Sequence, residues 1–368
     1  MKIALALLLI IAVSFGDDRS TACKIHNDCN EALIFSDDFD VLNTRTWKHE
    51  VTLGGGGNWE FELYVNNRTT SYVKDSVLYL HPRTTASVYG NDITQPGFEI
   101  NLWGGAPDGC TNNGFYGCQR GTGGGNIVNP ITSARINTIN SFSFKYGRVE
   151  VRAKLPLGDW IWPAIWLLPV DNMYGGWPAS GEIDLLESRG NQNYAGIKDG
   201  GVEGYSTTLH WGPDWAHNAY DLTHGSYKAP QGLLSDDFHI YGMYWDEERL
   251  VTYIDNPNNI VFNTSLSVDF WNNAISKGQK WENLSKPWTK KSPFDQEFYL
   301  IMNVAVGGVN GYFPDVGAKP WSNKSPHASA EFWSNRDKWE QTWKGDNVAM
   351  KVDSVKVWST KSTTYTKK

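Results

Sequence analysis

The sequence has no long apolar run after residue 16 and no excess of basic charge. No later stretch approaches the roughly 18 uninterrupted apolar residues that a membrane-spanning helix needs. The 368 residues include 33 basic and 40 acidic side chains, so the net charge is -7. Basic residues form no cluster of the kind that binds nucleic acid. These absences argue against a membrane span and against nucleic acid as a partner.

Strong helical periodicity is also missing, and residues 269–276 form at most one short helix. Glycine runs occur at 54–57 and 121–125. Neither run fits the dinucleotide-binding or P-loop pattern, and no strand–loop–helix unit surrounds them. We therefore expect flexible surface loops there rather than a nucleotide site.

Cysteine is scarce, with only Cys23, Cys29, Cys110 and Cys118. Four cysteines allow three disulfide connectivities, and sequence alone does not choose among them rigorously. The short loops favour Cys23–Cys29 and Cys110–Cys118. Neither pair has zinc-finger spacing, so we interpret both as structural disulfides of an oxidising compartment.

The start of the chain predicts export. A short positive start is followed by an apolar or small run over 3–15 and by small residues near 16, which is typical of a secretory signal peptide spanning 1–16. In a secreted, extracellular chain, Asn-x-Ser/Thr sequons are candidate glycosylation sites. They occur at Asn67, Asn263, Asn283 and Asn323.

Short strands separated by loops rich in Gly, Asn, Asp and Pro dominate the rest of the sequence. Residues 146–155 alternate apolar and charged side chains, as in a half-buried strand. Further strands are expected at 238–245, 250–254, 298–306 and 350–358, with the first two forming a hairpin. The pattern predicts an all-β sandwich of two packed antiparallel sheets.

Long all-β sandwiches often form one domain, so a single domain is expected over 33–360. It would be preceded by a short cysteine-containing segment, 17–32, and followed by a polar, frayed tail, 361–368. The chain contains 18 Trp and 17 Tyr residues. Their faces are suited to binding sugar rings in a cleft, although packing in the core and on sheet faces is the alternative for any single one.

The most informative segment contains Glu182, Asp184 and Glu187. A regular strand places Glu182 and Asp184 on one face, while Glu187 points to the other. A one-residue bulge around 185–186 would return Glu187 to the carboxylate side, and bulges are common beside active sites. Three acids on one face repel each other, so a fold seldom keeps them without a use.

Two glutamates have a chemical explanation in a retaining glycosidase. One ionised carboxylate attacks the anomeric carbon, and a second, protonated carboxyl about 5–5.5 Å away donates a proton to the leaving oxygen. A middle aspartate can hydrogen-bond the nucleophile and help to separate the two glutamate pKa values. The alternative is a solvated strand whose acids pair with Lys or Arg. The aromatic segment 160–169 nearby favours the catalytic interpretation.

These residues resemble glycoside hydrolase family 16, in particular its laminarinase-like group, whose E-x-D-x-x-E pattern matches 182–187. The similarity extends over about 33–358 and is greatest for the invertebrate (lipopolysaccharide and) β-1,3-glucan-binding proteins. It is carried by the segments 36–40, 57–60, 133–136, 144–148, 162–169, 303–308 and 352–353. The resemblance implies a concanavalin A-like β-jelly roll with a concave substrate cleft. Since only 17–32 precede the matching region, we expect no separate N-terminal glucan-binding domain.

The resemblance also implies roles for individual residues. Glu182 would be the nucleophile, Asp184 its assistant and Glu187 the acid/base, with no cofactor needed for catalysis. A structural calcium ion on the convex side is implied at Asp38 and Asp353, since carboxylates suit calcium. Candidates for the cleft lining are Asn58, Arg135, Trp166, Trp177, His210 and Asn303. For three of these, a purely structural role is the alternative: Trp166 in the core, Asn303 in a turn, and His210 as a hydrogen-bonded sheet residue.

Three functions remain open from the sequence. The first is a secreted endo-β-1,3-glucanase with a digestive or innate-immune role. The second is a non-hydrolytic recognition protein that binds β-1,3-glucan and lipopolysaccharide and signals through immune-cascade proteins. The third is an enzyme for another polysaccharide such as a galactan. Intact Glu182, Asp184 and Glu187 favour the first.

Overall fold

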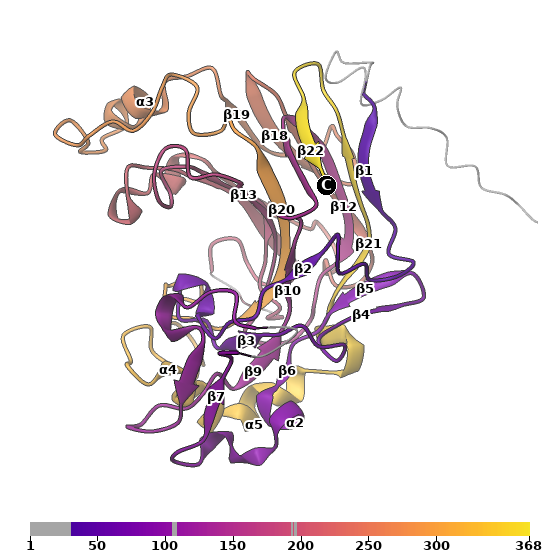
Figure 1. The fold of residues 1–368 in the computed structure, drawn as a ribbon, viewed down its shortest axis with the longest axis vertical. Helices are drawn as coiled ribbons and strands as arrows, with labels where there is room; N and C mark the ends of the chain where they lie inside the picture. The colour runs from indigo at the N-terminus through magenta and orange to yellow at the C-terminus, as the bar shows by residue number, and fades with distance from the viewer. Residues whose placement is uncertain (1–30, 105–108, 193, 195–196) are drawn as a thin grey trace, which may run out of the picture.

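The computed structural model describes residues 31–104, 109–192, 194 and 197–368. Two antiparallel sheets pack face to face as a jelly-roll sandwich (Figure 1). The eight-stranded sheet consists, in spatial order, of β19 (Ile260–Ser265), β18 (Arg249–Ile254), β17 (His239–Trp245), β12 (Gly147–Lys154), β21 (Met350–Trp358), β5 (Val77–Leu80) and β4 (Ser71–Lys74), with β1 (Leu33–Asp37) paired to β21.

The nine-stranded sheet carries the candidate site. In spatial order it consists of β16 (His224–Lys228), β15 (Gly204–His210), β14 (Glu182–Glu187), β13 (Ile161–Pro169), β20 (Phe298–Val306), β10 (Arg135–Asn137) and β2 (Lys48–His49). In addition, β11 (Phe142–Lys145) pairs with β20, and β22 (Thr364–Lys367) pairs with β11. β14 thus lies between β13 and β15 in the interior of the sheet, where both of its edges are hydrogen-bonded.

Alternation along each strand divides the side chains between the core and the outside. In β12 the residues Val149, Val151 and Ala153 are fully buried in the main core, as their spacing predicts. In β13 the core residues are Ile161, Ile165 and Leu167, which leaves the even-numbered side chains on the opposite face. The sandwich core therefore fixes which side chains the outer face of the nine-stranded sheet presents.

A smaller lobe lies at one end of the sandwich (Figure 1). Its strands are β3 (Glu62–Tyr64), β9 (Ile131–Ser133), β6 (Arg83–Thr84), β7 (Glu99–Asn101) and β8 (Gln119–Gly121), and its helices are α2 (Thr85–Tyr89), α4 (Ala328–Ser334) and α5 (Arg336–Trp339). A second hydrophobic cluster, which includes Phe61, Trp160, Trp321 and Phe332, fills its interior. Trp162 of β13 belongs to this second cluster, so the lobe packs directly beside the carboxylate strand.

Most predicted elements are confirmed. The predicted strands 298–306 and 350–358 coincide with β20 and β21, and β17 and β18 form the expected hairpin. The short helix α3 (Phe270–Ser276) follows Asp269, whose carboxylate accepts the Asn272 amide N–H. Two expectations are wrong: β22 pairs with β11, so 361–368 is not simply a frayed tail, and α2, α4 and α5 add helices beyond the single one expected.

The Cys110–Cys118 disulfide is present, whereas Cys23, Cys29 and the predicted signal peptide 1–16 lie outside the described residues. Of the predicted glycosylation sites, Asn263 and Asn283 are exposed, and Asn67 and Asn323 are half-buried. Glycosylation at all four remains a prediction. Within the described ranges, every helix is too short or too polar to cross a membrane.

Candidate active site

The bulge expected in the carboxylate strand is present. Asp184 faces Thr208 of β15 and Glu187 faces Ser206, so three steps along β14 match two along β15. Leu185 and Leu186 consequently both point into the main core, where they are almost completely buried. The extra residue returns Glu187 to the face that carries Glu182 and Asp184. We call this outer face of the nine-stranded sheet the carboxylate face.

Neighbouring strands present polar and aromatic side chains on the same face. β13 contributes Trp162 and Trp166, β20 contributes Asn303, β10 contributes Arg135, and β15 contributes His210, which lies opposite Glu182. Sheet pairing therefore brings together five of the predicted site positions: Glu182, Asp184, Glu187, Trp166 and His210 lie on three adjacent strands.

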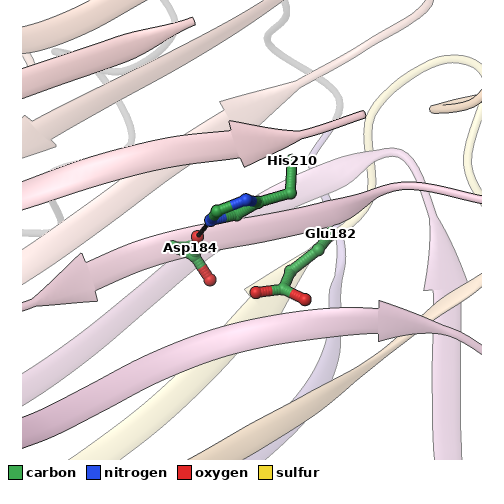
Figure 2. Close-up of side chains that lie close together, drawn as sticks. All are labelled: Glu182, Asp184 and His210. Atoms are coloured by element: carbon green, nitrogen blue, oxygen red, sulfur yellow. Dashed lines mark ion pairs between the residues drawn. The ribbon is translucent and has the colours of Figure 1, made fainter. Parts of the chain in front are cut away.

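Asp184 is the buried centre of the acid cluster. His210 Nε2 lies 3.1 Å from Asp184 Oδ2, and the two side chains lie beside Glu182 (Figure 2). Burial, followed by the negative charge of Glu182 and a hydrogen bond between the two carboxyl groups, raises the Asp184 pKa well above its ordinary value. Burial therefore shifts Asp184 toward its protonated form and places it next to Glu182 on the same face.

Glu182 and His210 are also held from the side by aromatic residues. Trp177 donates its indole N–H to Glu182 Oε2 at 2.6 Å, and its ring lies 5.6 Å from the His210 ring. The Tyr220 ring stacks on the His210 ring with 5.4 Å between their centroids. Asn218 Nδ2 lies 2.8 Å from His210 Nδ1. The imidazole is thus fixed by Asp184 on one side and Asn218 on the other, while Trp177 itself remains 46% exposed and accessible to a ligand.

Glu187 has a different environment. Trp162 donates its indole N–H to Glu187 Oε1 at 2.9 Å. The Trp162 and Tyr312 rings stack with 3.9 Å between their centroids. The Arg189 guanidinium lies over the Tyr312 ring, 4.0 Å from its centroid. This stack holds the indole N–H of Trp162 beside the Glu187 carboxyl group. It also shields one side of the indole from solvent.

The Glu187 pKa is raised to about 8. Burial is the main cause, and the negative charges of Asp184 and Glu182 act in the same direction, whereas His210 and the Trp162 hydrogen bond lower it. Glu187 is therefore protonated at neutral pH. The strand thus places Glu182, which accepts the Trp177 N–H, and Glu187, which retains its proton, on the same face.

A second hydrogen-bonded group extends the carboxylate face toward β10. Trp166 donates its indole N–H to Asn303 Oδ1 at 2.6 Å, and Asn303 donates to the Tyr64 hydroxyl at 3.0 Å. The Arg135 guanidinium lies 4.5 Å from the Trp166 ring centroid and 2.9 Å from Glu50 Oε1. Trp166 and Asn303 thus lie on the outer face, and neither the core nor the turn alternative applies.

Asn58 lies in the loop before β3 and not on a strand of the nine-stranded sheet. It follows the short helical turn η1 (Gly55–Gly57), and its side chain donates to Glu60 Oε1 at 3.0 Å. Two residues of the site were missed from the sequence, Trp162 and Tyr312. Trp162 is four residues before Trp166 on the same strand, so alternation places both on one face and could have predicted Trp162 as a site residue. Tyr312 lies in a loop with no periodic signal.

The predicted calcium residues have other partners. Asp38 lies 3.2 Å from Lys356 Nζ, and Asp353 lies 3.2 Å from Arg152 Nη1. Calcium takes six to eight oxygen ligands. In the part of the chain that the structure describes, neither aspartate belongs to a group of three acidic or histidine side chains. Backbone carbonyl and water oxygens are also calcium ligands, so calcium binding at Asp38 and Asp353 stays a prediction. Among the described residues, such a group forms only at Glu182, Asp184 and His210.

A jelly roll with an acid cluster on the outer face of one sheet defines a class of carbohydrate-active protein. Residues 122–275 match the sequence profile of the glycosyl hydrolases family 16. The β-1,3-glucan-binding protein of Penaeus monodon is 47% identical over 350 residues, covering 91% of this chain and 93% of that protein. The chain belongs to glycosyl hydrolase family 16.

Two further similarities agree with this assignment. β-1,3-glucan-binding protein 2 of Manduca sexta is 32% identical over 343 residues, covering 90% of this chain but only 65% of that relative's length. The solved catalytic domain of an endo-1,3-β-glucanase (laminarinase) from Thermotoga petrophila RKU-1 superposes with a TM-score of 0.57 at 25% identity, covering 90% of this chain and 99% of that domain.

Proposed function

We propose that this protein is a retaining endo-β-1,3-glucanase. The observation that carries the proposal is the bulge in β14, which brings Glu182, Asp184 and Glu187 onto one face in different environments. Two relatives named for β-1,3-glucan binding and a superposable laminarinase domain support β-1,3-glucan as the ligand. Trp166, Trp177, His210, Arg135 and Asn303 are the proposed sugar contacts beside the acids.

In the first step, Glu182 attacks the anomeric carbon and forms a glycosyl ester as the glycosidic bond breaks. The leaving oxygen takes the proton of Glu187, whose raised pKa keeps that proton available at neutral pH. Asp184 and the Trp177 N–H hold Glu182 in the orientation for attack.

In the second step, Glu187 has lost its proton and acts as a base. It takes a proton from a water molecule that attacks the anomeric carbon, the ester to Glu182 breaks, and both glutamates return to their starting states. Two inversions at one carbon give net retention of configuration.

Export is proposed together with the enzyme activity. The Cys110–Cys118 disulfide is suited to an oxidising compartment, and soluble glucan or microbial cell wall would be met there.

A recognition role toward β-1,3-glucan or lipopolysaccharide, acting through immune-cascade proteins, is the second candidate, because the relative at 47% identity is named a binding protein. Release of reducing ends from laminarin separates the two.

The stereochemistry of the first product tests the mechanism. We expect proton NMR of a fresh digest of laminarin to show the β-anomer first, with the α-anomer appearing only as the sugar mutarotates. A covalent intermediate on Glu182 requires this order. An initial α-anomer would contradict the roles of both glutamates.

Replacing Trp162 with Phe is expected to move the alkaline limb of kcat/KM to higher pH. The substitution keeps an aromatic ring against Tyr312 but removes the N–H that lowers the Glu187 pKa, so Glu187 holds its proton to a higher pH. Trp166→Phe is the matched control in the same strand, since its N–H bonds to Asn303 instead. If the two variants shift the limb equally, or if Trp162→Phe shifts it downward, Glu187 does not control it.

A further inference from the structure

A cavity of about 600 Å³ lies in the smaller lobe, and its lining includes none of the catalytic acids. Pockets of roughly 300–1,000 Å³ are typical of small-molecule sites. Its wall combines aromatic, charged and amide side chains, including Trp59, Glu60, Tyr116, Arg120 and Asn126. Neither the catalytic mechanism nor the packing of the sandwich requires this cavity.

Aromatic side chains at this cavity are exposed to solvent: Trp59 and Tyr116 line it, and Phe115 packs against Trp59 beside it. Trp59 is 43% exposed, Phe115 is 50% exposed and Tyr116 is 73% exposed. All three have left-handed backbone conformations, with φ of 53°, 55° and 59°. Bulky residues rarely adopt this region, and such strain concentrates at ligand-binding and active sites. Glycine or asparagine would suit these turns better, so the large exposed rings have a role other than folding.

Contacts also hold the Trp59 and Phe115 rings in place. The Cys110–Cys118 disulfide closes the loop that carries Phe115 and Tyr116. The Phe115 ring packs edge-on against Trp59 with 5.7 Å between centroids. Rigid, exposed aromatic groups lose little conformational entropy when they bind a ligand.

Arg120 connects the two aromatic loops. Its guanidinium lies 5.6 Å from the Trp59 ring centroid, donates to Asn129 Oδ1 at 2.6 Å, and donates to the Phe115 carbonyl at 2.7 Å. Burial lowers the Arg120 pKa to about 10, so the side chain is still a cation at neutral pH. The wall thus offers a positioned donor next to flat aromatic surface.

This cavity adjoins the end of a strand that carries a proposed sugar contact. Asn58 accepts the Val309 amide N–H at 2.9 Å and donates to Glu60 at 3.0 Å, and both Val309 and Glu60 line the cavity. Val309 follows β20, the strand of Asn303. The cavity wall and the strand of Asn303 are therefore joined through the three residues that follow Val306.

We infer that this cavity is a second glucan-binding site, which takes a segment of the β-1,3-linked glucosyl chain beyond the catalytic acids. Exposed Trp and Tyr rings match the apolar C–H faces of pyranose rings, and Glu60, Arg120 and Asn126 supply acceptors and donors for sugar hydroxyls. The identity of the ligand rests on the proposed function, whereas the existence of the site rests on the cavity and its strained aromatic residues.

Chain-length dependence of binding tests the inference. In a Glu182→Gln background, which prevents degradation, the affinities for long laminarin and for laminaritriose are measured by calorimetry. We expect Trp59→Ala and Tyr116→Ala each to reduce the ratio of laminarin affinity to laminaritriose affinity about tenfold or more. Loss of a central aromatic contact typically costs this much affinity. Tyr116→Phe keeps the ring and is expected to retain the ratio.

Tyr365→Ala is the matched control, because Tyr365 is 50% exposed and lies on β22 at a different edge. We expect it to leave the ratio at the parent value. Tyr116→Gly separates binding from folding: it relieves the left-handed strain, so the thermal midpoint should not fall while long-chain affinity does.

Two failures are distinguishable. If the parent binds both glucans and neither Trp59→Ala nor Tyr116→Ala changes the ratio, the second site is wrong and the proposed function stands. If the parent binds neither glucan, the glucan assignment itself is wrong and the second site falls with it. A reduced ratio in a protein whose native form releases no reducing ends supports the second site and overturns the proposed enzyme.

Discussion

Glu182→Gln is expected to reduce kcat on laminarin by about 10⁴-fold or more while leaving laminarin binding within about twofold of the native protein. Removing the nucleophile of a covalent mechanism removes the step that the rest of the site assists, and in another hydrolase class this costs on the order of 10⁶. The amide is nearly isosteric and can still accept the Trp177 N–H, so the shape of the carboxylate face is retained. Reducing-end release and calorimetry on the same preparation measure the two quantities.

Glu282→Gln controls for the chemical change itself, because Glu282 is exposed and lies outside the site. It should retain native activity and binding. Two results would change the interpretation. Substantial activity in Glu182→Gln would remove Glu182 from the mechanism, and an inert native protein that binds laminarin as well as Glu182→Gln does would favour recognition without hydrolysis.

The carboxylate strand shows why much of this site could be predicted from sequence. An E-x-D-x-x-E spacing can place all three acids on one face only with an extra residue, and the two leucines between Asp184 and Glu187 can both point to the core. The structure has this arrangement, with both leucines buried. Local alternation and the chemistry of paired carboxylates were sufficient here because both act within a few residues.

The features that were missed depend on contacts between distant segments. β22 is a short, polar strand whose residues resemble a tail, and it is ordered by pairing with β11, more than two hundred residues earlier in the chain. The helices of the smaller lobe have four to seven residues, too few for a 3.6-residue period to appear. Tyr312 joins the site through stacking on Trp162, which no local pattern encodes.

Glu187→Gln is expected to lower kcat on laminarin by about 10²–10⁴-fold and to abolish the alkaline limb of the pH profile. General acid catalysis contributes a factor of this size. In the native protein the rate should fall as pH rises through the Glu187 pKa of about 8, because the deprotonated carboxylate has no proton to give to the leaving oxygen. Glutamine does not titrate, so the residual rate of the variant should not show this fall. Profiles of kcat/KM from about pH 5 to about pH 10 compare the two proteins, with the unperturbed Glu value near about 4.3 as reference.

Azide distinguishes the role of Glu187 from that of Glu182. With a dinitrophenyl β-laminaribioside, departure of the leaving group needs no proton, so Glu187→Gln should still form the ester on Glu182 and then stall without its base. Azide needs no deprotonation, attacks the ester, and should restore turnover with a β-configured glycosyl azide as product. In Glu182→Gln, azide can only replace the nucleophile itself, and the product should be the α-azide. If azide gave the α-product from Glu187→Gln, or if this variant hydrolysed the substrate without azide as fast as the native protein does, the acid/base would not be Glu187.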